Sequence, residues 1–157
     1  MIRVFLALAA VGCAAEQAVE EPLTECGGAG DPTLTLGTGS LTTFAPFADG
    51  ESVVLFETAG KLGLNLALLT TGLATEDVVT AVIKVAIDNE NADAIASLSL
   101  QCPSEGPGWV QVFAPLPASR QGVDPATLSG LTLTLDGVAT DSRDITASTE
   151  PVDLVVE

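Results

Sequence analysis

The side chains best able to bind a metal ion in this sequence are crowded into one short polar segment. Asp88, Glu90, Asn91 and Asp93 lie close together between two apolar runs. Ca²⁺ prefers oxygen ligands of this kind, and loops between strands can supply the six to eight that it takes. The spacing departs from an EF-hand, because no glycine follows and no bidentate glutamate closes the loop. The segment predicts either a calcium site or, more simply, a solvated polar turn.

Asp136, Asp141 and Asp144 form a second acidic group, which we interpret in the same two ways. Trp109 is the only tryptophan of the chain. It could anchor a sugar or a partner, although a tryptophan in a β-sandwich is more often a core residue.

The amino-acid composition does not favour a catalytic site. Histidine and tyrosine are absent, which removes the commonest general base and the Ser-His-Asp and Cys-His nucleophilic schemes. Aromatic residues make up 4% of the chain, too few for the usual aromatic sugar platforms of a glycosidase. No G-x-S-x-G motif occurs, and Thr70-Thr71-Gly72 lacks the aspartate of an aspartic-protease triplet. We therefore expect a protein that is not an enzyme.

The first residues have the pattern of a secretory signal. Arg3 supplies a positive charge, and an uninterrupted apolar run from Val4 to Val11 follows it. This run is much shorter than the roughly 20 residues that a membrane-spanning helix needs. Residues 1–12 are therefore predicted to be a signal peptide.

Ala10-Val11-Gly12-Cys13, directly after the apolar run, resembles the lipobox of bacterial lipoproteins. The resemblance implies that the Cys13 thiol is diacylated and that a dedicated peptidase then cleaves before it. Ala14 follows where an aspartate would imply retention at the inner membrane, so the resemblance implies the outer membrane of a Gram-negative bacterium. The alternatives are a plain signal peptide cleaved after Ala15, or a buried first strand.

Assigning Cys13 to lipid leaves two other cysteines, Cys26 and Cys102. An even number in an oxidising compartment predicts a disulfide, which would pin the start of the domain to its core. Closing a loop of this length contributes about 4–5 kcal/mol in the chain-entropy model. Two separate buried thiols are the alternative.

The formal net charge of −16 limits the classes of partner. A field of this sign repels phosphate backbones, so we expect no nucleic-acid binding. It also disfavours contact with anionic headgroups, which leaves the lipid on Cys13 as the expected membrane contact.

Hydrophobic patterning divides the remaining chain in two. Residues 13–32 comprise the lipidated cysteine and an acidic tether rich in glycine and proline, whereas residues 33–157 alternate apolar and polar positions between turn signals. This alternation predicts one all-β domain, an antiparallel β-sandwich with an Ig-like architecture and about eight or nine strands. The resemblance to Ig domains is one of architecture alone, because Trp109 does not lie between the cysteines in sequence.

Several strands can be predicted in detail. Leu62 to Leu68 places four leucines on one face, and the β-branched run 79–87 favours a strand over a helix. Residues 88–93 are expected to form the turn of a hairpin into a strand at 94–102. Asp124 should cap one helical turn with Pro125 at its first position. The strand at Leu131–Leu135 should end at Asp136-Gly137.

The order of signal, lipobox, acidic tether and a single β domain is similar to many small uncharacterised lipoproteins of Gram-negative bacteria. We expect a lipid-anchored envelope module that binds a partner or supports an envelope structure. One alternative is a calcium-dependent adhesion or ligand-binding module. Another is a subunit of an export or assembly complex that uses an exposed sheet edge.

Overall fold

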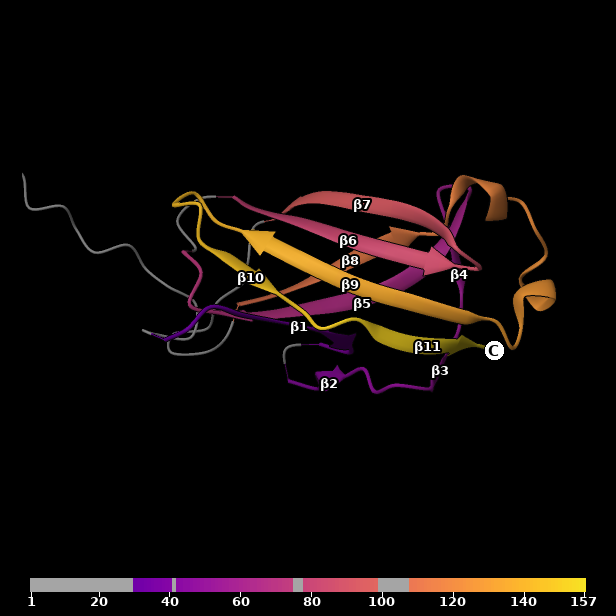
Figure 1. The fold of residues 1–157 in the computed structure, drawn as a ribbon, viewed down its shortest axis with the longest axis horizontal. Coiled ribbons are helices and arrows are strands. Elements are labelled where there is room, and N and C mark those ends of the chain that lie inside the picture. The colour runs from indigo at the N-terminus through magenta and orange to yellow at the C-terminus, as the bar shows by residue number, and fades with distance from the viewer. Residues whose placement is uncertain (1–29, 41, 75–77, 99–107) are drawn as a thin grey trace, which may run out of the picture.

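The computed structural model describes residues 30–40, 42–74, 78–98 and 108–157, which form two β-sheets packed face to face (Figure 1). The all-β sandwich predicted from the alternation is confirmed. The described residues contain eleven strands rather than eight or nine, because four of them are only two or three residues long. The strands are β1 (Thr33–Thr38), β2 (Ala45–Pro46), β3 (Glu51–Val53), β4 (Phe56–Thr58), β5 (Lys61–Thr71), β6 (Val79–Ile87), β7 (Glu90–Leu98), β8 (Gly108–Pro115), β9 (Thr132–Thr140), β10 (Thr146–Ser148) and β11 (Val152–Val156).

Strand β5 is the centre of the five-stranded sheet. β8 pairs antiparallel along one of its sides, from Gly63 opposite Pro115 to Thr70 opposite Gly108. β1 and β4 follow one another along its other side, and β2 pairs with the outer side of β1. This arrangement puts residues of three separate chain segments side by side on each face of the sheet.

The six-stranded sheet has the order β3-β11-β9-β6-β7, with β10 beside β9, and it lies in front of the other sheet in Figure 1. The pairs within it are antiparallel except β11 with β3, which run parallel. The parallel pair is the one departure from the antiparallel sandwich expected. It joins β11, the last strand, to β3, an early one.

Alternation places the core between the sheets. The four leucines predicted to share a face of β5 are all buried, and the intervening residues of β5 face away from the core. On β6 the buried positions are Val79, Ala81, Ile83, Val85 and Ile87. Leu133 and Leu135 of β9 and Leu154 of β11 complete the opposing surface.

Some boundaries differ from those predicted. The turn between β6 and β7 is only Asp88-Asn89, and β7 already begins at Glu90. β9 continues through Gly137 to Thr140, because Gly137 packs inside the sandwich beside the Ile83 and Leu34 side chains. A glycine does not mark the end of a strand when neighbouring side chains fill the space beside it.

The predicted helical turn is confirmed as a 3₁₀ helix, η2 (Pro125–Leu128). The Asp124 side chain accepts a hydrogen bond of 3.0 Å from the backbone N–H of Ala126. A second 3₁₀ helix, η1 (Ala118–Arg120), follows β8. Gln121, directly after it, exchanges hydrogen bonds with the backbone of Leu62 and so fastens this connection to the start of β5.

The two ends of the sandwich carry different parts of the chain. At one end Gly30 and Pro32 lie against Gly72, just beyond the last residue of β5. At the other end, on the right of Figure 1, are the β6–β7 turn, both 3₁₀ helices and the C-terminus. The outer faces of both sheets run along the length of the molecule between these ends.

Shortening a fully buried side chain should test the two-sheet core. Leu154→Ala removes a side chain that is 0% exposed and leaves a cavity between the sheets. We expect the free energy of unfolding to fall by about 2–5 kcal/mol in urea denaturation followed by circular dichroism. The matched control is Val138→Ala on the outer face of β9, 39% exposed, with an expected loss below about 1 kcal/mol. Equal losses for the two variants would contradict this placement of the core.

Candidate functional site

The acidic residues predicted as calcium ligands start at the β6–β7 turn. Asp88 and Asn89 both have positive φ, 48° and 65°, as a two-residue hairpin turn of type I′ requires. The guanidinium of Arg120 pairs with the Asp88 carboxylate at 3.1 Å and with the Glu90 carboxylate at 3.3 Å. Ser119 also donates a hydrogen bond to Glu90. Arg120 and Ser119 thus engage two of the four candidate ligands and tie η1 to the turn.

The other two candidate ligands point elsewhere. Glu90 pairs with Ile87, a buried position, whereas Asn91 and Asp93 alternate onto the outer face of the sheet. There Asp93 lies opposite Lys84, which also lies opposite Asp136. Within the described part of the chain, no cluster of three or more acidic, cysteine or histidine side chains could hold a metal ion. The turn is built around salt bridges and cross-strand pairs.

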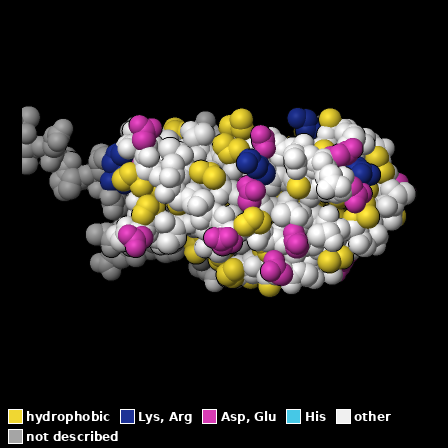
Figure 2. Space-filling model, viewed as in Figure 1, with side chains coloured by type: hydrophobic (Ala, Val, Ile, Leu, Met, Phe, Trp, Pro, Cys, Tyr) yellow, Lys and Arg dark blue, Asp and Glu magenta, His cyan; other side chains and the backbone are white. Residues whose placement is uncertain are grey.

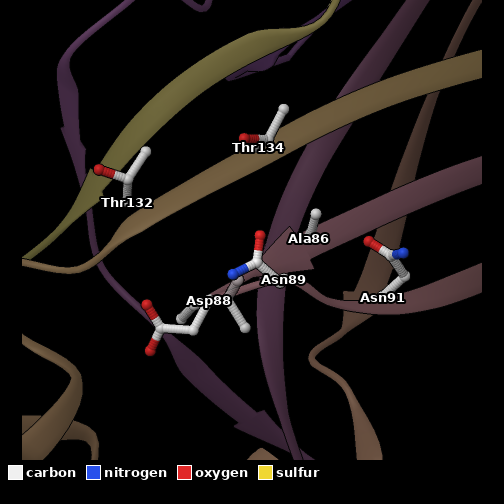
Figure 3. Close-up of a pocket in the computed structure, with 7 residues that line it drawn as sticks. Ala86, Asp88, Asn89, Asn91, Thr132 and Thr134 are labelled. Atoms are coloured by element: carbon white, nitrogen blue, oxygen red, sulfur yellow. The ribbon is translucent and has the colours of Figure 1, made fainter.

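A shallow hollow of about 430 Å³ lies beside this turn (Figure 3). Its lining comes from the end of β6, the turn, the start of β7 and the first half of β9, and in Figure 3 the Asn89 side chain projects between Asp88 and Ala86. The Thr134 hydroxyl on its wall already donates to the Asp153 carboxylate at 2.6 Å. This hollow is polar and open, and part of its hydrogen-bonding capacity is used within the protein.

Two members of the second acidic group, Asp136 and Asp141, have different environments. Asp136 faces outward beside Lys84, but the Asp141 side chain is 0% exposed. Its carboxylate accepts hydrogen bonds from the backbone N–H groups of Ala74, Arg143 and Ile145, at 2.9, 2.9 and 3.0 Å. The Arg143 guanidinium pairs with the same carboxylate at 2.8 Å. Asp141 thus closes the β9–β10 loop and joins it to the segment that follows β5.

Two opposing effects set the pKa of Asp141. Burial raises the pKa, because the charged carboxylate loses contact with water. The hydrogen bond from Ala74, the Arg143 side chain and the backbone N–H groups of Ile145 and Arg143 together outweigh that effect. The pKa of Asp141 therefore lies below its ordinary value, and the group is a charged structural anchor at neutral pH.

Trp109 lies on the outer face of the five-stranded sheet, opposite Leu69 of β5. It is half-buried rather than a core residue, and its indole N–H has no hydrogen-bond acceptor. Phe113 lies two positions further along β8, on the same face, and Phe56 of β4 joins them through its pairing with Gly63. Three aromatic side chains from two strands thus share one face.

Rings on this face lie against glycines. A Cβ atom built on Gly63 would come within 2.8 Å of the Phe113 ring, and one on Gly37 within 2.8 Å of the Phe44 ring. The tip of each ring therefore lies over a position that has no side chain, where a neighbouring backbone carbonyl also approaches closely. Next to Phe113 is a hollow of about 350 Å³, lined by the exposed amides of Asn65 and Gln111 together with Val112 and Phe113.

The outer face of the five-stranded sheet is almost free of charge. Its outward positions on β1, β5 and β8 carry no acidic residue, and the single basic one is Lys61 at the start of β5. The outer face of the six-stranded sheet differs, since Lys84 lies between two aspartates. Figure 2 shows acidic and basic side chains scattered over the front of the molecule, where the six-stranded sheet lies.

Sequence reasoning considered Trp109 alone and missed the group around it. The alternation of Trp109, Gln111 and Phe113 within one strand was a signal that these side chains share a face. Their placement beside Asn65 could not be predicted, because it depends on the pairing and register of β8 with β5, which are far apart in the chain.

The cysteines expected to be modified, Cys13, Cys26 and Cys102, lie outside the described residues. Among the residues that are described, no helix has the length and apolarity needed to cross a membrane.

Comparisons with known proteins identify no family. No family model matches the chain, and no curated protein matches it. Among solved structures, it is similar to the N-terminal domain of PorA, with 8% sequence identity and a TM-score of 0.29 over 80% of this chain and 98% of that chain. A likeness of this degree says nothing about a ligand or a partner.

The buried carboxylate of Asp141 should make stability depend on pH. Because its folded pKa lies below its unfolded value of about 3.9, the unfolded chain takes up the proton first as the pH falls. The contribution of Asp141 is complete above that unfolded value and disappears as the pH drops through the lower folded pKa. Urea denaturation from pH 7 to pH 3 should therefore show a smaller acid-induced loss in Asp141→Asn than in the parent protein.

At pH 7 the same variant should be about 2–3 kcal/mol less stable, because Asn cannot replace the charged partner of Arg143 and the backbone donors. Asp136→Asn, which changes an outward carboxylate beside Lys84, is the control and should cost less than about 0.5 kcal/mol. A pH profile unchanged by Asp141→Asn would rule out this role.

Proposed function

We propose that this chain is an extracytoplasmic lipoprotein, held on a membrane through Cys13, whose β-sandwich is a non-enzymatic binding module. The observation that carries the binding role is the unequal distribution of charge. In a protein with a net charge of −16, the outward positions of β1, β5 and β8 include aromatic and amide side chains and no carboxylate. An uncharged face that carries aromatic side chains on an otherwise strongly acidic chain favours a site of interaction there.

The anchor is proposed from the apolar run and the Ala10-Val11-Gly12-Cys13 motif, which resembles a lipobox. Acyl chains contribute about 0.8 kcal/mol for each buried methylene, so a multiply acylated cysteine would hold the domain firmly on a membrane. The motif and Ala14 favour the outer membrane of a Gram-negative bacterium. The described chain begins at the end of the sandwich near Gly72, so a tether from Cys13 would join there and leave both sheet faces accessible.

A disulfide between Cys26 and Cys102 is part of this proposal. Cys26 precedes the first described residue, Gly30, by four positions, and Cys102 follows the last residue of β7, Leu98, by four. A bond between them would fasten the tether to the sandwich. It would also limit how far the domain moves relative to its anchor.

The non-enzymatic role is supported by composition and by the use of the buried carboxylate. Histidine is absent, and Asp141, the buried acid among the described residues, is occupied by Arg143 and three backbone donors. The calcium-dependent alternative is not favoured by any contact, because Arg120 pairs with two of the predicted ligands and the others point away from Glu90.

The alternative of an assembly subunit is favoured by one feature, the edge strand β7. Because the two-residue turn makes Ile87 and Glu90 a hydrogen-bonded pair, the backbone groups of Asn91, Asp93 and Ile95 point away from β6. Ile95 is 73% exposed beside this edge, with which no other strand pairs in the part of the chain that the structure describes. An extended segment of an envelope protein could add to the sheet there.

Cys13→Ser tests the anchor. Without the thiol no acyl chain can be attached, so we expect labelling by a fatty-acid analogue to disappear and the protein to leave the membrane fraction. Cys26→Ser, which keeps Cys13, is the control and should keep both the label and the membrane location. A Cys13→Ser protein that is still labelled and membrane-bound would refute the lipoprotein assignment.

A pair of proline variants tests the edge strand. The N–H of Ile95 points outward, so Ile95→Pro blocks strand addition without removing a bond to β6. We expect the domain to stay folded and any partner crosslinked from membranes to be lost. Ala94→Pro removes a bond to β6 and should instead destabilise the sandwich. Unchanged crosslinking with folded Ile95→Pro would remove this second candidate.

A further inference from the structure

We infer that the outer face of the five-stranded sheet binds a neutral saccharide, at the hollow between Asn65 of β5 and Gln111 of β8. This inference rests on the proposed binding function and names its site and ligand class. It is carried by three features of the same face, namely its lack of carboxylates, its exposed amides and its aromatic rings over glycine positions.

The lack of charge selects the class of ligand. A cationic partner would be drawn to the acidic surfaces of the chain, such as the outer face around Asp93 and Asp136, and would gain nothing from this sheet. An anionic partner would be repelled by the net charge of −16. A neutral ligand is neither repelled by the net charge nor drawn to the acidic surfaces. It can therefore contact this face, where the outward positions of three strands carry no carboxylate.

The amides supply polar recognition. Asn65 and Gln111 are exposed and come from adjacent strands, with Asn65 opposite Phe113 and Gln111 opposite Ala67. Each amide offers a donor and an acceptor, which matches the mixed donor and acceptor character of a sugar hydroxyl. The Gln111 side-chain amide donates one long hydrogen bond of 3.3 Å to the Gly39 carbonyl, and its oxygen remains available to accept one from a ligand. Both amides line the 350 Å³ hollow.

The rings supply an apolar floor. The tip of the Phe113 ring lies over Gly63, and that of the Phe44 ring lies over Gly37. The apolar C–H face of a pyranose can be buried against such a ring while its hydroxyls reach the neighbouring amides. Trp109 and Phe56 extend the aromatic surface along β8 and onto β4. Phe56 and Trp109 lie opposite Gly63 and Leu69, so the strip runs about 20 Å along β5, which is long enough for several sugar units.

Two other occupants fit the face less well. A second copy of the chain would bring together two bodies that each carry a charge of −16. A purely apolar partner, such as the acyl region of a lipid, would leave the Asn65 and Gln111 amides buried without hydrogen bonds, which is costly. A neutral saccharide satisfies the amides and contacts the rings together.

The sole tryptophan of the chain gives a direct readout, because it lies on this face. The full protein is purified from membranes in a detergent without a sugar headgroup and titrated with cellohexaose, maltohexaose and chitohexaose. We expect at least one hexasaccharide to change the Trp109 emission saturably, with a Kd on the order of 0.1–1 mM. Sedimentation equilibrium of the same samples should show a monomer at every concentration.

Three variants localise the binding. Asn65→Ala and Gln111→Ala alter exposed side chains, so the fold should survive, and each should weaken binding by about tenfold or more. Asn91→Ala removes an exposed amide from the outer face of the other sheet and should leave the affinity unchanged. The inference would be overturned if no hexasaccharide changed the Trp109 emission saturably at concentrations up to 10-fold above about 1 mM. It would also be overturned by equal affinity in all three variants, or by a dimer that buries Trp109. Release of Cys13→Ser from membranes tests the anchor separately, so either claim can fail alone.

Discussion

Burial of one side of each long strand between the two sheets is the constraint on which the rest of this structure depends. Successive residues of a strand point to opposite faces, so the leucines of β5 cannot enter the core without turning Asn65, Ala67 and Leu69 outward. The same constraint acts on β8, where burial of Val112 and Ala114 turns Gln111 and Phe113 outward. The candidate binding face is therefore a direct consequence of how the core is packed.

The buried charge at one end of the sandwich serves this packing. Asp141 joins the β9–β10 loop to the segment after β5, so it links the two sheets at the end where the described chain begins. A buried carboxylate is tolerated there because four groups donate to it or pair with it, which offsets the loss of hydration. The other end is closed by exposed interactions, in which Arg120 joins η1 to the β6–β7 turn. Exposed pairs of this kind contribute less to stability than the Asp141 network.

The outer faces of the two sheets differ in the side chains that cover them. The six-stranded sheet spaces Lys84, Asp93 and Asp136 across neighbouring strands, as a solvated face usually does. The five-stranded sheet instead covers its backbone with rings over Gly37 and Gly63. Rings on glycines also stabilise a sheet by covering its backbone. The added presence of Asn65 and Gln111 beside a hollow is what favours recognition over stability alone.

Much of the fold followed from the sequence alone, because alternation is a local property of the chain. The leucine face of β5, the strand assignment of β6 and the Asp124 cap of η2 were all predicted from neighbouring residues and are confirmed. The turn at 88–93 and the end of β9 at Gly137 were predicted wrongly, since polar residues and glycine indicate a break unless a paired strand holds them.

The signal peptide and the lipid on Cys13 are also sequence-based predictions, because a short motif specifies them without any fold. Which outward-facing residues lie next to one another depends on the tertiary structure alone. Asn65 and Gln111 are brought together by the register of β5 with β8, and Asp141 meets Ala74 across the gap between two sheets. These pairings depend on contacts between residues far apart in the chain, and no local pattern encodes them.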